Sequence, residues 1–120
     1  MEANDPVKSR QVTAIVLGCG QRGQIYSRYA VEYPHCLKIV AVADPLKHRR
    51  DKVAQMSGLT NPDFIVDDWA KLASMPGKIA DCAFITTQDQ MHKEPAVAFA
   101  AKGKYKATVL IDKNGLALKS

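Results

Sequence analysis

Short apolar runs alternate with stretches of helical spacing along most of the chain. The runs predict five strands, at Val12–Leu17, Leu37–Ala43, Phe64–Val66, Asp81–Thr86 and Tyr105–Ile111. The stretches between them predict four helices, at Arg22–Tyr33, at Lys47–Ser57, in a short segment after Asp67, and at His92–Lys102. Such an alternation is typical of a parallel sheet with helices on both faces, and right-handed crossovers make that sheet doubly wound. The predicted fold class is therefore α/β, in a single domain.

Local signals set the ends of these helices. The first helix carries Ile25, Tyr29 and Tyr33 on one stripe and is stopped by Pro34. The second helix is predicted to point three apolar side chains inward, those of Leu46, Val53 and Met56. Gly58 is predicted to cap its C-terminus. Asp67 is predicted to cap the short third helix, whose apolar face is Trp69, Leu72 and Ala73.

A glycine pattern joins the first predicted strand to the first predicted helix. It reads Gly18-Cys19-Gly20-Gln21-Arg22-Gly23. Gly18 allows a tight turn, Gly20 lets a pyrophosphate approach the backbone, and Gly23 lets the helix pack closely on the strand. The N-terminus of the helix offers N–H groups and partial positive charge to phosphates. With an acid after the second strand, about twenty residues on, the pattern predicts a dinucleotide-binding domain of the Rossmann type, with three α/β/α layers.

Asp44 is the acid that completes this pattern. Its carboxylate is expected to accept hydrogen bonds from the adenosine ribose and to repel a 2′-phosphate, which favours NAD over NADP. Arg49 and Arg50 follow shortly after and are able to grip a phosphate, although helical spacing lets only one of them point readily toward the loop. We therefore place Arg49 among the cofactor-binding residues. A tight turn alone explains any one of the glycines, but less easily all three together with Asp44.

Composition and charge narrow the class of protein. The chain has 120 residues, 47% of them hydrophobic, and a net charge of +5. Its basic residues gather at residues 47–50 and 102–119 with few aromatics between them, so solvated surface is favoured over nucleic-acid binding. No apolar run approaches the roughly 20 residues that span a bilayer, and the polar start is unlike a signal peptide.

Cysteines and acids suggest no further chemistry. The three cysteines are widely spaced, which favours reduced thiols and a cytoplasmic location. Cys19 lies at a helix N-terminus, which lowers a thiol pKa, but no base or resolving cysteine accompanies it. We therefore interpret Cys19 as a small residue that fills a tight cofactor-binding loop. The spacing of Asp67, Asp68 and Asp81 does not fit a metal site, so none is predicted.

Four segments carry a more specific pattern: residues 14–23 (AIVLGCGQRG), 39–45 (IVAVADP), 81–87 (DCAFITT) with His92 after it, and 98–104 (AFAAKGK). They resemble the N-terminal domain of the glucose–fructose oxidoreductase, inositol dehydrogenase and MocA (Gfo/Idh/MocA) family. Biliverdin reductase is a more distant relative of this family. The resemblance implies a domain that binds NAD or NADP. It also implies hydride transfer on sugars, cyclitols and similar hydroxy compounds in full-length members.

The resemblance also implies residues near the reacting end of the cofactor. Thr86, Thr87 and the loop to His92 would border the nicotinamide. Family members have a lysine near the reacting carbon of the cofactor, in a Glu-Lys-Pro sequence. Asp112-Lys113-Asn114 is similar, but it lies further along the chain than the family motif and has asparagine in place of proline. Lys113 is therefore a weak candidate for the catalytic lysine. The family continues with a large α+β domain that binds substrate, supplies a catalytic histidine and mediates oligomerisation. That domain is not among these 120 residues, so we expect cofactor binding without turnover.

Three function classes remain open from the sequence. The favoured one is the cofactor domain of an oxidoreductase; the others are a regulatory module that binds a dinucleotide without chemistry and a basic nucleic-acid-binding module. We expect residues 1–10 to be a mobile lead-in, 11–112 the dinucleotide-binding domain and 113–120 a tail. The expected partners are the dinucleotide and a second copy or a C-terminal domain, with no nucleic acid and no membrane.

Overall fold

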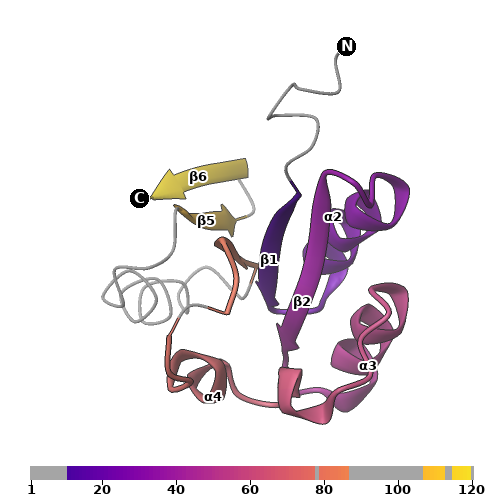
Figure 1. Ribbon diagram of the computed structural model, residues 1–120, viewed down its shortest axis with the longest axis vertical. Coiled ribbons are helices and arrows are strands. Elements are labelled where there is room, and N and C mark those ends of the chain that lie inside the picture. Colours follow the sequence, from indigo (N-terminus) through magenta and orange to yellow (C-terminus); the bar gives the residue numbers. More distant parts are fainter. Residues whose placement is uncertain (1–10, 78, 87–106, 113–114, 120) are drawn as a thin grey trace.

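The computed structural model describes residues 11–77 and 79–86 with their side chains, and residues 107–112 and 115–119 by their backbone. Its strands form one sheet in the order β3-β2-β1-β4-β5-β6 (Figure 1). The strands are β1 (Val12–Leu17), β2 (Leu37–Ala43), β3 (Ile65–Val66), β4 (Cys82–Ile85), β5 (Ala107–Asp112) and β6 (Gly115–Lys119). The helices are α2 (Gln21–Glu32), α3 (Lys47–Met56), the 3-10 turn η2 (Pro62–Phe64) and α4 (Trp69–Ala73). The helix predicted at residues 92–102 lies outside the described residues.

The sheet is parallel from β3 to β5, as predicted. The order reverses direction at β1, which has β2 on one side and β4 on the other, so the sheet is doubly wound. The sixth strand was not predicted: β6 runs antiparallel to β5 and occupies most of the stretch expected to be a tail. Asp112 pairs with Gly115, and a connection of this length only allows the chain to turn back on itself.

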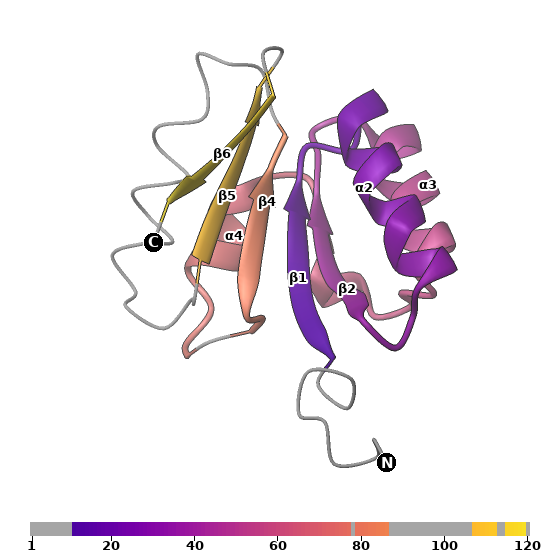
Figure 2. The same ribbon diagram turned by 90° about the horizontal axis from the view of Figure 1, so that it is seen from above.

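Two apolar layers bury both faces of the central strands. Ala14 and Val16 of β1 belong to the layer under α2 and α3, whereas Ile15 and Leu17 belong to the layer under α4. Figure 2 shows α2 and α3 together beside β1 and β2. Alternate side chains therefore point to opposite helices, which is why β1 is apolar at nearly every position.

The inner face of α2 is made of small residues. Gly23, Ser27 and Ala30 are its buried positions. The predicted stripe faces outward instead, since Ile25 and Tyr29 are 48% and 50% exposed. Small side chains on the inner face let the helix axis approach the sheet, and large ones do not fit there.

Helix α3 begins at Lys47 and is followed by a glycine cap, both as predicted. Gly58 has φ +72, and the N–H groups of Gly58 and Leu59 donate to the Gln55 and Ala54 carbonyls at 3.2 and 2.9 Å. This is the glycine cap that the sequence predicts. The prediction that Leu46 points inward is wrong, because Leu46 precedes the first helical turn in extended conformation and is 45% exposed.

The cap of α4 lies one residue later than predicted. Asp68, not Asp67, accepts the Ala70 N–H at 2.9 Å. Asp67 instead pairs with Lys71 at 2.8 Å, one helical turn further on. The predicted apolar face of α4 is confirmed, since Leu72 is buried and its neighbours on that face pack against the same core layer.

Candidate functional site

Four parallel strands end level with one another, and a polar or glycine residue follows each. Their last residues pair across the sheet in one row, and this row is Leu17, Ala43, Val66 and Ile85. The residues that follow are Gly18, Asp44, Asp67 and Thr86. Backbone bonds of 2.8 to 3.1 Å from Gly18, Asp44 and Thr86 tie these positions to neighbouring strands. The sheet thus gathers at its carboxyl edge residues that lie far apart in sequence, where open α/β sheets bind ligands.

The three glycines of the loop are needed for different reasons. Gly18 has φ +99, a conformation that favours glycine. A Cβ on Gly23 would lie 2.1 Å from the Gly18 carbonyl oxygen, so this position requires glycine for packing. Gly20 is extended, and among the described residues a Cβ there would meet only the Arg49 guanidinium, at 3.5 Å. Packing of the described residues therefore does not require glycine at Gly20, and a position without a Cβ is one that a ligand can approach closely.

The N-terminus of α2 suits an anion. Gly20 is its N-cap, with no side-chain cap and no acidic residue in the first turn. Gln21 is exposed and Arg22 partly exposed at the start of this 12-residue helix. The first N–H groups of a helix have no partner within the helix and add to a partial positive charge.

Two arginines of α3 reach the same edge of the sheet. The Arg49 guanidinium lies over Gly20. Arg50 donates from Nη1 to the Asp44 and Pro45 carbonyls, at 3.2 and 3.3 Å. Arg49 is therefore the arginine that meets the glycine loop, whereas Arg50 binds the backbone that follows β2, in agreement with the expectation that only one of the two points to the loop.

Asp44 is 5% exposed and holds two segments of backbone together. Its Oδ2 accepts the Cys19 N–H at 2.7 Å, and its Oδ1 accepts the Leu46 N–H at 2.8 Å. A carboxylate oxygen has two acceptor positions, so each oxygen keeps one more. Asp44 therefore links the glycine loop to the start of α3 and retains acceptor capacity for a hydroxyl group.

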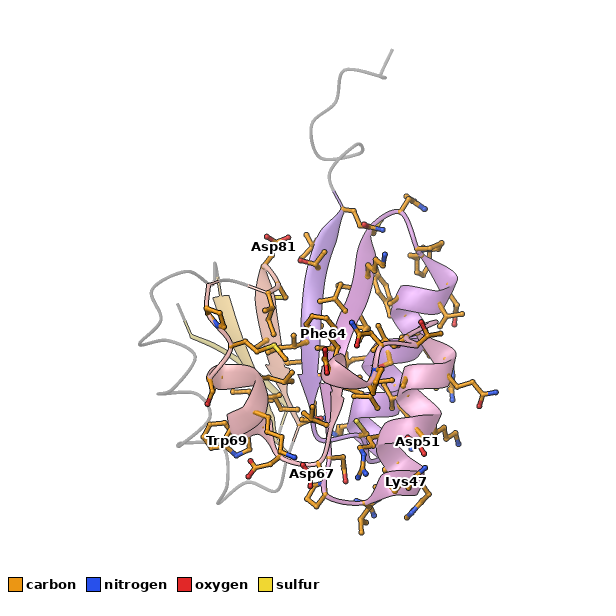
Figure 3. The ribbon with its side chains drawn as sticks, turned by 60° about the horizontal axis from the view of Figure 1, so that its bottom comes forward. Lys47, Asp51, Phe64, Asp67, Trp69 and Asp81 are labelled. Carbon is orange, nitrogen blue, oxygen red and sulfur yellow. The ribbon has the colours of Figure 1, made fainter. Side chains whose placement is uncertain are left out.

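A pocket of about 370 Å³ lies beside the glycine loop. Gly18 and the ends of β1 and β2 line one part of it, and the rest is lined by Asp44, Pro45, Asp67, Asp68 and Trp69. Figure 3 shows Asp67 and Trp69 at the end of the molecule opposite Asp81. The ammonium group of Lys71, which donates a hydrogen bond to Asp67, lowers the pKa of that carboxyl. The pocket thus combines an aromatic wall with three carboxyl groups.

Two side chains bind the carbonyl groups of the glycine loop. The Thr86 hydroxyl lies 2.5 Å from the Gly18 carbonyl oxygen and 3.1 Å from that of Leu17. The Gln24 amide donates to the Cys19 carbonyl at 3.1 Å. Sequence reasoning missed Gln24, since a glutamine inside a helix gives no signal of which carbonyl it binds.

Three predicted site residues cannot be placed. Thr87, His92 and Lys113 lie outside the described residues. The other predicted residues, from Gly18 to Gly23 with Asp44, Arg49 and Thr86, all lie at or beside the carboxyl edge.

Cys19 is an inert part of the loop. It is fully buried, and burial, with the negative charge of Asp44, raises its pKa to about 12. The possible lowering of this pKa by the helix N-terminus does not occur, because desolvation of a buried thiolate outweighs it.

We expect iodoacetamide at pH 8 to alkylate Cys36 and to spare Cys19 and Cys82. Cys36 is exposed, whereas burial raises the pKa of Cys82 to about 11. A thiol with a pKa of about 12 is ionised in about one molecule in ten thousand at that pH. Intact mass should show one adduct on the folded protein and three in urea. Rapid alkylation of Cys19 in the folded protein would contradict its assignment as a buried, inert thiol.

The chain matches one protein family over nearly its whole length. The match covers residues 12–113 and is to the Gfo/Idh/MocA oxidoreductases, described as an oxidoreductase family with an NAD-binding Rossmann fold. No curated protein matches the chain in sequence. Within the described part of the chain, no helix has both the length and the apolar character required to cross a membrane.

Two solved structures share the fold. The WlbA dehydrogenase from Bordetella pertussis, in complex with NADH and UDP-GlcNAcA, has a TM-score of 0.67 at 14% identity, and the match covers 86% of this chain. The WlbA dehydrogenase from Chromobacterium violaceum, with the same two ligands, has a TM-score of 0.69 at 13% identity over 93% of this chain. The chain spans 29% and 30% of the length of these two dehydrogenases.

Proposed function

Since the chain belongs to the Gfo/Idh/MocA family of oxidoreductases, we propose that it binds NAD(H) at the carboxyl edge of its sheet, as the cofactor domain of a dehydrogenase. The substrate class that the family implies is a sugar, cyclitol or similar hydroxy compound. The UDP-GlcNAcA in the two WlbA dehydrogenases supports a sugar derivative. Hydride transfer requires a substrate held against the nicotinamide by a preorganised site. We propose that the 120 residues alone bind cofactor without turnover.

The surroundings of Gly20 carry this proposal. Packing of the described residues does not require glycine at Gly20, which caps the N-terminus of α2 and has the Arg49 guanidinium over it. A backbone without a Cβ, a helix N-terminus and a cation together suit a pyrophosphate.

The pocket beside the loop would take the adenosine. Asp44 would accept from the ribose hydroxyls through the acceptor positions that the backbone leaves unused. Carboxyl groups of Asp67 and Asp68 line the same pocket, and a 2′-phosphate there would be repelled. This arrangement supports NAD over NADP, and the NADH in the two WlbA structures agrees with it.

The reacting end of the cofactor would lie beyond the ends of β4 and β5. We propose Thr87, His92 and Lys113 as residues near the nicotinamide, on the basis of the family resemblance. A cytoplasmic location is supported by the three cysteines, which all carry free thiols.

Replacement of Gly20 by valine is expected to weaken NADH binding by about 100-fold and to leave the fold intact. The branched side chain would stand between the phosphates and the backbone, and loss of two charge-assisted hydrogen bonds costs about 3 kcal/mol. Binding is measured by quenching of Trp69, the only tryptophan of the chain, during titration with NADH.

The matched control is Gly20→Ala, whose single methyl meets, in the described part of the chain, only the guanidinium of Arg49. We expect an intermediate loss of affinity, with far-ultraviolet circular dichroism and urea midpoints of both variants close to the parent. Equal NADH affinity in parent and Gly20→Val would place the phosphates elsewhere. Failure of the folded parent to bind NADH at all would overturn the proposed function.

A further inference from the structure

The peptide group between Gly18 and Cys19 is held from both sides by side chains of neighbouring strands. Its carbonyl oxygen lies 2.5 Å from the Thr86 hydroxyl, at the end of β4. Its N–H donates to Asp44, at the end of β2, at 2.7 Å. The C=O and N–H of a trans peptide point in opposite directions. Bonds from both sides therefore fix the rotation of this peptide plane.

The orientation of this plane decides what the loop offers to a phosphate. The carbonyls of Gly18 and Cys19 point to the side-chain donors of Thr86 and Gln24. A carbonyl turned toward a phosphate repels it, whereas successive N–H groups turned outward bind it. The inward carbonyls thus leave the outer side of the loop to donors.

The Thr86 hydroxyl is committed to the backbone of the loop. A hydroxyl has one proton to donate, and both nearby acceptors, at 2.5 and 3.1 Å, are carbonyls that begin the glycine turn. Thr86 also touches the other end of the turn, because a Cβ on Gly23 would lie 3.2 Å from its Oγ1. As a β-branched residue it has few rotamers, so this placement is rigid.

We propose that Thr86 is a positioning residue of the phosphate loop, whose hydroxyl holds the Gly18 carbonyl away from the cofactor pyrophosphate. This inference rests on the proposed function and gives Thr86 a different role from contact with the nicotinamide. It links the end of β4 to the loop after β1, so that the orientation of the loop depends on a residue 68 positions away in sequence.

The chain offers a matched control at the opposite edge of the sheet. Thr13 also joins β1 to the start of β4 through its hydroxyl, which accepts the Asp81 N–H at 3.0 Å and lies 3.2 Å from Asp81 Oδ2. Thr13→Val and Thr86→Val therefore both remove a hydroxyl that bridges these strands. Only Thr86→Val removes one from the phosphate loop.

The test compares the binding of NADH, ADP and adenosine by the two variants. Thr86→Val is expected to weaken NADH and ADP binding by about tenfold, since one hydrogen bond that orients the loop is lost. Its adenosine affinity should change by less than about twofold, because adenosine carries no phosphate. Thr86→Ser keeps the hydroxyl and should restore the affinity for NADH, whereas Thr13→Val should lower the urea midpoint and leave all three affinities unchanged. Thr86→Ala serves in place of Thr86→Val if the valine variant does not fold.

Amide hydrogen exchange separates this inference from the proposed function, because it needs no ligand. Thr86→Val should accelerate exchange at the Cys19 N–H, and Thr13→Val should not. Unchanged exchange at Cys19, equal NADH binding by Thr86→Val and the parent, or a parallel loss of adenosine affinity would each overturn the positioning role. A parent that binds no NADH while its Cys19 exchange responds to Thr86→Val would overturn the proposed function alone.

Discussion

Gly23→Ala is expected to destabilise the protein by about 3 kcal/mol and to abolish measurable NADH binding. The new methyl carbon would lie 2.1 Å from the Gly18 oxygen and 3.1 Å from the Gly18 carbonyl carbon. These are backbone atoms, so the clash is relieved only if α2 moves away from β1 or the glycine turn changes its path. Overpacking of this kind costs about 1–3 kcal/mol, and more where backbone must move.

The measurement is a urea unfolding curve followed by circular dichroism, with NADH titration of the folded fraction. Gly20→Ala is the control, since it adds the same methyl three residues earlier, in a place where it makes only an ordinary contact. A Gly23→Ala protein as stable as Gly20→Ala would show that α2 does not pack on the loop as described.

The same glycine shows how far the sequence predicts this site. The spacing of Gly18, Gly20 and Gly23 between a strand and a helix predicted both the turn and the close packing that the structure contains. The acid after β2 was predicted at the edge of the sheet, because parallel strands bring their carboxyl ends together, whereas Thr86 was expected near the cofactor from the family resemblance. Local pattern and topology suffice for the glycine loop and the acid.

The sequence pattern did not predict which face of α2 packs against the sheet. Helical periodicity groups Ile25, Tyr29 and Tyr33 on one stripe, but whether a stripe faces the core depends on the space beneath the helix. The small residues Gly23, Ser27 and Ala30 fit that space and form the buried face. Larger apolar side chains are left outside, where Tyr29 and Tyr33 contact each other.

Hydrogen bonds between segments that are distant in sequence were likewise not predictable from the sequence. The two bonds on the Gly18–Cys19 peptide come from residues 25 and 68 positions away. A threonine at a strand end and an acid at another have many alternative partners, and only the packed sheet selects among them. The strand β6 was missed although the sequence carries a signal for it, because Asn114-Gly115 follows the fifth predicted strand and Asn-Gly is a common turn of β-hairpins.

Asp44→Asn is expected to lower the affinity for NADH by more than tenfold and to lower that for NADPH much less. Asparagine has one carbonyl oxygen, so one of the two N–H groups now bound by the carboxylate, from Cys19 and Leu46, would meet an NH2 group instead. Loss of one such bond to a charged acceptor costs about 1.5–3 kcal/mol, and we expect the free energy of unfolding to fall by that amount. NADH loses the ribose interaction and part of the loop geometry together.

NADPH would lose the same loop geometry but would gain relief from repulsion. At an effective dielectric near 20, two like charges about 4 Å apart repel by about 4 kcal/mol, and solvent reduces this figure. The ratio of NADPH to NADH dissociation constants should therefore fall by at least tenfold in Asp44→Asn.

Asp67→Asn is the control, since Asp67 lines the same pocket but binds Lys71 rather than the loop. It should shift the ratio slightly in the same direction without loss of NADH affinity. An unchanged ratio in Asp44→Asn would remove Asp44 from the ribose site, and a parent that binds NADPH at least tenfold more tightly than NADH would show that Arg49 and Arg50 outweigh the carboxylates.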